Sequence, residues 1–123
     1  MADHLRRQEY ARLRAAAETT RERLVIRLIG EAGVRPAEQT RVRPGDVDRR
    51  RFGGVTHHFL SVRDDDDTPS RRTYLSGELA QTIDEYAATA GTDPDGRLLD
   101  ITPRRVQMLV SEVADRAAET TGE

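Results

Sequence analysis

The middle of the chain changes its hydrophobic period, and this change is the strongest constraint on the fold. Between residues 47 and 75, β-branched and aromatic residues are frequent, and apolar and polar positions alternate along much of the run. A period of two is typical of a strand. Turn residues divide the region at Gly53-Gly54 and again from Asp64 to Pro69. We therefore expect three short antiparallel strands, near 47–51, 57–63 and 71–75.

The segment before this region repeats its apolar residues with the period of a helix. We expect helices over 5–17, 19–32 and 36–42, followed by a turn at 44–46. The second helix is apolar around most of its girth, which is typical of a central buried helix. Thr19 is its expected cap and Gly33 its expected end, and Pro36 suits the first turn of the third helix.

Two further helices are expected after the strands. Ser76 is the expected cap of a helix that runs to Ala90 and stops at Gly91. Thr102 is the expected cap of the last helix, which runs to about Glu119, because its apolar residues recur at helical spacing.

The sequence thus predicts one α+β domain that is mainly helical, with a small three-stranded antiparallel sheet. The expected order of elements is ααα-βββ-αα. Residues 1–46 are expected to be helical, 47–75 to form the sheet, and 76–119 to form two helices. Residues 120–123 are expected to be a frayed end.

The composition excludes several kinds of chemistry. All 20 basic residues are arginine, and the chain has no cysteine. Without cysteine there is no disulfide, thiolate metal site or cysteine nucleophile, and without lysine there is no Schiff base. The charged N-terminus is unlike a secretory signal, and no apolar run approaches the roughly 20 residues of a membrane span. We expect a cytoplasmic protein with no membrane partner.

No metal, cofactor or small-molecule substrate is expected. Four consecutive acidic residues, Asp64 to Asp67, do not converge on one ion without a dedicated loop geometry, so a solvated turn is favoured. His57 and His58 alternate along a strand and therefore point to opposite faces.

Charge is distributed unevenly along the chain. Residues 1–51 hold 13 arginines and 8 acidic residues, whereas residues 52–123 hold 7 arginines and 14 acidic residues. The first part is therefore the one to examine for a polyanionic partner. It includes the run Arg49-Arg50-Arg51, for which solvent exposure and a phosphate contact remain equally open.

Arg35 stands between the long apolar helix and Pro36, at the expected start of the third helix. A guanidinium fork beside free backbone amides and a positive dipole end suits a phosphate oxygen. An arginine at such a junction is also common on ordinary surfaces, and taken alone that reading is favoured. The surroundings of Arg35 reverse this preference.

The order of these motifs resembles the catalytic domain of the tyrosine recombinase (phage integrase) family. The resemblance covers nearly the whole chain. It rests on Leu24–Ile29, the run Ala32–Glu38, Pro44-Gly45-Asp46-Val47-Asp48, Phe59–Arg63, Arg71–Leu75 and Ile101–Gln107.

The resemblance implies roles for particular residues. Arg35 matches the family's first catalytic arginine, which holds the scissile phosphate, and Glu38 matches the acidic position that supports it. We expect Arg35 to be partly buried near Glu38 and the sheet. The DNA-contacting residues implied or suggested by position are Arg35, Arg41, Arg43, Arg71, Arg72, Arg104 and Arg105.

The chain also departs from the family pattern. The family's lysine belongs in the turn between the second and third strands, where this chain has four aspartates and then Arg71 and Arg72. The His-x-x-Arg box and the tyrosine nucleophile lie downstream of a helix like the last one here. We therefore expect the first half of such a domain, which binds duplex DNA and does not cut it alone. Self-association on the DNA stays open.

Two other functions stay open at the level of sequence. The chain could be a non-catalytic DNA-binding or scaffold module of a larger transcriptional regulator, as the missing lysine and the acidic turn suggest. It could also be a helix-rich protein-interaction domain with no DNA role, which the acidic second part of the chain supports.

Overall fold

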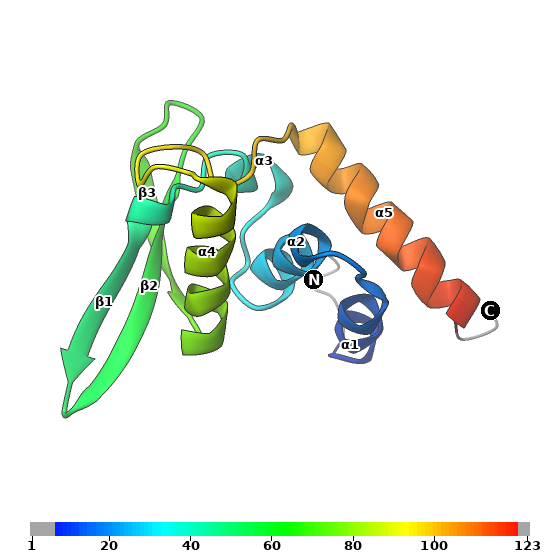
Figure 1. The fold of residues 1–123 in the computed structure, drawn as a ribbon, viewed down its shortest axis with the longest axis horizontal. Coiled ribbons are helices and arrows are strands. Elements are labelled where there is room, and N and C mark those ends of the chain that lie inside the picture. Colours follow the sequence, from blue (N-terminus) through cyan, green and yellow to red (C-terminus); the bar gives the residue numbers. More distant parts are fainter. Residues whose placement is uncertain (1–6, 121–123) are drawn as a thin grey trace.

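A computed structural model describes residues 7–120 of the chain. Five α-helices and one three-stranded antiparallel sheet form an α+β fold over this range (Figure 1). The elements in chain order are α1 (Arg7–Ala16), α2 (Thr20–Gly30), α3 (Pro36–Gln39), the 3-10 turn η1 (Pro44–Asp46), β1 (Val47–Phe52), β2 (Val55–Arg63), β3 (Pro69–Leu75), α4 (Gly77–Ala90) and α5 (Pro103–Thr120). The expected class and order are confirmed. Residues 1–6 and 121–123, which include the first two residues of the expected first helix and most of the frayed end, lie outside the described residues.

Helix α2 is the central helix, as its apolar girth predicts. Residues 24–28 are all buried, and α2 contacts each of the other four helices. Thr19 caps it by accepting the Glu22 N–H at 3.1 Å. Gly33 ends the turn after it with φ +67°, a left-handed conformation that glycine adopts without steric cost.

Helix α3 is shorter than the sequence predicts. It covers Pro36–Gln39 instead of 36–42. The next N–H groups, those of Arg41 and Val42, bond three residues back at 3.0 and 3.3 Å, which tightens and ends the helix. The Val42 carbonyl then accepts the Leu98 N–H at 2.8 Å, so this segment is held by a distant loop that helical periodicity does not reveal.

The other two predicted caps are confirmed. Ser76 accepts the Leu79 N–H at 3.0 Å at the start of α4, and Gly91 ends that helix with φ +68°. Thr102 accepts the Arg105 N–H at 3.1 Å at the start of α5.

The sheet has the order β1-β2-β3, with both pairs antiparallel. Leu60 pairs with Val47 on one side and with Thr73 on the other, and a register shift follows between Val62 and Arg63. Because side chains opposite one another share a face, this register divides the sheet into two faces. The face that includes Leu60 and Leu75 is directed at the helices, with α4 beside it in Figure 1.

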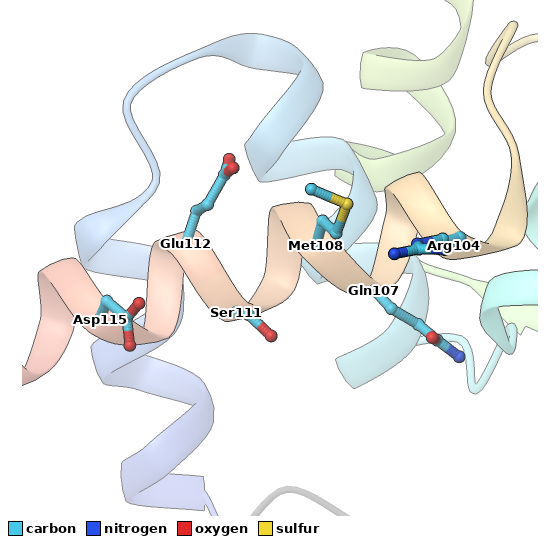
Figure 2. Close-up of a pocket in the computed structure, with 6 residues that line it drawn as sticks. All are labelled: Arg104, Gln107, Met108, Ser111, Glu112 and Asp115. Atoms are coloured by element: carbon cyan, nitrogen blue, oxygen red, sulfur yellow. The ribbon is translucent and has the colours of Figure 1, made fainter.

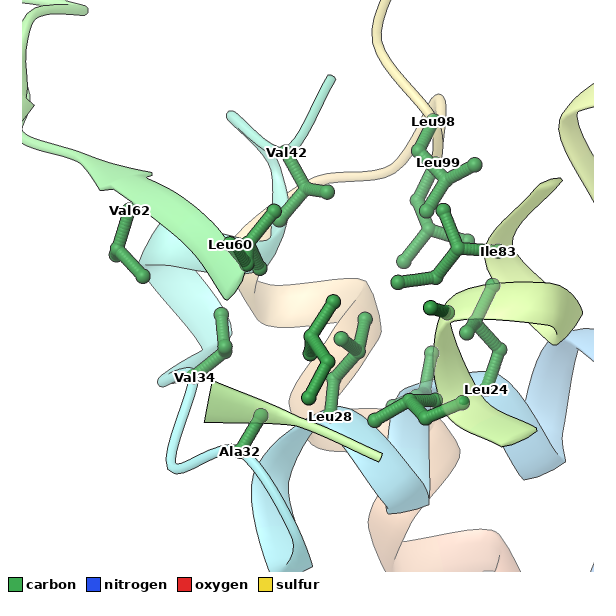
Figure 3. Packing of buried hydrophobic residues seen from close by; sticks show 14 of the residues in the cluster. Leu24, Leu28, Ala32, Val34, Val42, Leu60, Val62, Ile83, Leu98 and Leu99 are labelled. Atoms are coloured by element: carbon green, nitrogen blue, oxygen red, sulfur yellow. The ribbon is translucent and has the colours of Figure 1, made fainter. Parts of the chain in front are cut away.

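The core lies between this sheet face and the helices (Figure 3). Leu28 occupies its centre, with Leu60 and Val34 on one side and Ile83 and Leu99 on the other. A second cluster joins α1, α2 and α5 through Leu13, Ala17, Ile26 and Val113.

None of the helices between residues 7 and 120 combines the length and the apolar character needed to cross a lipid bilayer.

Candidate nucleic-acid interface

Glu38 binds two arginines that come from separate parts of the chain. Its Oε1 accepts the Arg71 guanidinium at 2.8 Å and the Arg35 backbone N–H at 2.9 Å. Its Oε2 accepts the Arg35 guanidinium at 3.3 Å. The Glu38 side chain is only 11% exposed. A buried carboxylate thus gathers two guanidinium groups, one from the start of α3 and one from β3.

Side-chain hydrogen bonds to backbone carbonyls hold β3 beside the loop that carries Arg35. Thr73 Oγ1 donates to the Ala32 carbonyl at 2.8 Å, and Arg71 donates to the Gly33 carbonyl at 3.0 Å. Gly33 turns the chain out of α2, and Pro36 sets the backbone for the first turn of α3. The sequence-predicted pair Arg35 and Glu38 is therefore joined to Arg71 by the tertiary fold.

The expectation that Arg35 is partly buried is wrong. Its side chain is 77% exposed, although it does lie next to Glu38 as expected. The reason is that only one guanidinium nitrogen reaches Glu38, and the rest of the side chain extends outward. The Arg35 amide is also not free, because Glu38 accepts its N–H. Any anion at this position would therefore be bound by guanidinium groups and not by the end of α3.

The cluster keeps Glu38 ionised. Burial by itself raises the pKa of the Glu38 carboxyl, but hydrogen bonds from the Arg35 N–H and from the Arg71 and Arg35 guanidinium groups outweigh burial. The net effect holds the pKa of Glu38 below its ordinary value of 4.5.

This pKa shift predicts an acid-dependent loss of stability. A carboxyl with a lowered folded pKa stabilises the fold above its unfolded pKa, and this contribution is lost as the pH falls through the folded pKa. We expect the wild-type free energy of unfolding to fall below about pH 4.5, and to fall less steeply in Glu38→Gln. Urea unfolding between pH 6 and pH 3 measures this difference. Exposed Glu112→Gln is the matched control, and equal slopes for wild type and Glu38→Gln would contradict the prediction.

Two other predicted contact residues are engaged with the turn between β2 and β3. Arg41 donates to the Arg63 carbonyl at 3.2 Å, and Arg43 pairs with Asp67. Asp66 accepts the Thr68 hydroxyl at 2.6 Å. Asp67 is thus paired with a cation, whereas Asp66 is bonded to a neutral hydroxyl and keeps its charge.

The remaining predicted contact residues do not join the cluster. Arg72 follows Arg71 along β3 and is directed to the opposite face of the sheet. Arg104 and Arg105 lie in the first turn of α5, where Arg105 pairs with Glu112 at 3.5 Å.

Arg104 lines a depression on the outer side of α5 (Figure 2). All of its lining residues belong to this one helix, and they are Arg104, Gln107, Met108, Ser111, Glu112 and Asp115. A single helix cannot enclose a ligand, and the lining combines both signs of charge. This depression therefore has the character of an ordinary helix surface.

The sequence did not reveal Gln39, a buried residue of α3 that supports the cluster of Arg35, Glu38 and Arg71. Gln39 is completely buried, and its amide donates to the Val25 carbonyl at 3.1 Å and the Val34 carbonyl at 3.4 Å. It therefore ties α3 to α2 and to the residue before Arg35. No periodic signal identifies it, because a buried glutamine and an exposed one look alike in a sequence.

Comparisons of the chain with protein-family models, with curated proteins and with solved structures find no match.

Proposed function

We propose that this chain is a DNA-binding module in which Arg35 and Arg71 together contact one backbone phosphate. The observation that carries the proposal is the arrangement at Glu38, which brings two guanidinium groups from distant segments to one point. The Arg35 side chain is mostly exposed and that of Arg71 is 38% exposed, so each has N–H donors available to an outside ligand. Guanidinium groups bind phosphate oxygens with matched geometry.

The resemblance to the first half of a tyrosine recombinase catalytic domain supports the same site. Arg35 and Glu38 match the family's arginine and supporting acid, and the strand that carries Arg71 follows the turn in which the family places its lysine. The order of helices and strands fits this resemblance. Site-specific recombination or integration of DNA is accordingly the reaction in which such a domain would take part.

Strand transfer by this chain alone is not part of the proposal. Tyr10 lies on α1 bonded to Glu31, and Tyr86 lies on α4 against the core. Tyr74 lies on the sheet face opposite Arg71. None of these hydroxyl groups is placed with Arg35, and a guanidinium does not replace a proton-donating lysine. Without a nucleophile, a phosphate clamp binds DNA but does not cleave it.

The test is the salt dependence of duplex binding. Each phosphate contact adds about 0.9 to the slope of log K against log salt concentration. Because both guanidinium groups contact the same phosphate, we expect the double variant Arg35→Ala/Arg71→Ala to reduce this slope by about 1, and each single variant to reduce it by no more than that. Fluorescence anisotropy with a labelled 20-base-pair duplex, from 25 to 200 mM salt, measures the slopes.

Two controls make this result specific. Arg7→Ala removes an exposed arginine of α1 and should keep the wild-type slope. Arg35→Lys keeps the charge without the fork, so its affinity should fall between those of wild type and Arg35→Ala. A wild-type slope in the double alanine variant would overturn the phosphate contact. Absence of duplex binding at 25 mM salt would instead favour a protein-interaction domain.

A further inference from the structure

The face of the sheet that points away from the helices carries a cluster of aromatic rings. The register places Phe52, Val55, His57, Phe59 and Tyr74 together on this face. The ring centroids of Phe52 and His57 are 5.6 Å apart, those of His57 and Tyr74 are 6.3 Å apart, and those of Phe59 and Tyr74 are 5.9 Å apart. Both phenylalanines of the chain belong to this cluster.

This face is uncovered. Phe52 is 59% exposed and Tyr74 is 55% exposed, and with Val55 they make up three of the four large apolar side chains exposed between residues 7 and 120. Figure 1 shows the β1–β2 hairpin extending away from the helical part of the molecule, and α4 covers only the opposite face. Rings in water lose the hydrophobic free energy that burial would supply, so such a patch indicates a binding surface.

The charges on this face favour an anionic ligand. Arg72 lies over the Phe59 ring, with its guanidinium carbon 4.8 Å from the ring centroid, and it makes no ion pair among the described residues. Arg50 is on the same face and pairs with Asp48 at 2.8 Å. Asp48 shares this face, so its pairing with Arg50 leaves Arg72 as the cation available there to a ligand.

We infer that this aromatic face binds an unpaired segment of nucleic acid, with bases stacked on Phe52 and Tyr74 and phosphates beside Arg50 and Arg72. Aromatic rings stack on any base, and arginines follow the backbone. Apart from Val55, the exposed apolar residues of this face are all rings, which suits base stacking better than the mixed aliphatic surface of a protein interface. Duplex bases are already stacked and cannot use these rings, so the site is distinct from the proposed duplex contact at Arg35.

The test separates base stacking on a ring from simple contact with an apolar side chain. The probe is fluorescently labelled (dT)12 in anisotropy titrations, with the same protein titrated against the 20-base-pair duplex. We expect Tyr74→Ala and Phe52→Ala each to weaken (dT)12 binding by roughly 5- to 150-fold. Tyr74→Phe keeps the ring and should bind like wild type, whereas Tyr74→Leu keeps apolar bulk only and should lose most of the affinity.

Control variants distinguish this site from the proposed duplex contact. Tyr74→Ala should leave the duplex affinity unchanged, and exposed Arg7→Ala on α1 and Met108→Ala on α5 should affect neither probe. Circular dichroism confirms that each variant is folded. Equal affinity of wild type, Tyr74→Ala and Tyr74→Leu for (dT)12 would overturn the inference. So would concentration-dependent self-association that Tyr74→Ala abolishes while (dT)12 does not compete with it, because the face would then be a protein interface.

Discussion

Replacing Leu28 with alanine is expected to lower the free energy of unfolding by about 3 kcal/mol. Leu28 is completely buried in α2 and lies at the centre of the main core (Figure 3). The sheet, α4 and the loop before α5 all contribute side chains around it. Its truncation removes buried methyl groups and leaves a cavity that no single neighbour can fill without moving.

The expected loss is large for a chain with so few core residues. Domains retain a net stability of only about 5–15 kcal/mol, so 3 kcal/mol is a substantial share. Urea unfolding followed by circular dichroism measures it. Leu28→Met conserves the volume and should cost less than about 1.5 kcal/mol. A loss below 1 kcal/mol in Leu28→Ala would contradict the central position of α2.

Replacing Gln39 with methionine is expected to cost about 2 kcal/mol of folding free energy. Methionine matches the length of the glutamine side chain, so the loss comes mainly from the two hydrogen bonds to the Val25 and Val34 carbonyls. Both of these residues are completely buried, so water cannot replace the lost amide. The Val34 carbonyl directly precedes Arg35, which makes Gln39 a positioning residue for the candidate site.

Two measurements test the role of Gln39. Thermal or urea unfolding gives the loss of stability, and exposed Gln81→Met should change it by less than about 0.5 kcal/mol. In the duplex titration, Gln39→Met should lower the affinity without changing the salt slope, because no cation is removed. A stability equal to that of wild type would show that the buried hydrogen bonds contribute nothing net.

Some helix ends could be predicted from neighbouring residues in the sequence, and others could not. Thr19, Ser76 and Thr102 act as predicted caps, and Gly33 and Gly91 have the left-handed conformation expected of helix ends. These signals are short-range, since a cap needs only a side chain and an amide two or three residues away. The end of α3 was not predictable in this way, because a hydrogen bond from Leu98 to Val42 lies beyond any local window.

The candidate site likewise combines residues that are close in the sequence with one that only the fold brings near. A sequence motif identified Arg35 and Glu38, which are three residues apart on one turn of chain. The further role of Arg71 as the second guanidinium depends on where β3 lies relative to the loop after α2. The exposure of Arg35 was mispredicted, because the depth of a side chain is set by how the surrounding elements pack and not by its neighbours in sequence.

The sequence by itself therefore determined the class of each element, their order and the caps, because hydrophobic period and capping depend on residues that are close along the chain. It also contained the alternation that places His57 and Phe59 on one side of a strand. Only the tertiary structure decided that Phe52 and Tyr74 join them on an uncovered face, and that Glu38 gathers Arg35 and Arg71. The physical reason is that register and burial are properties of segments far apart in sequence, which meet only when the core forms.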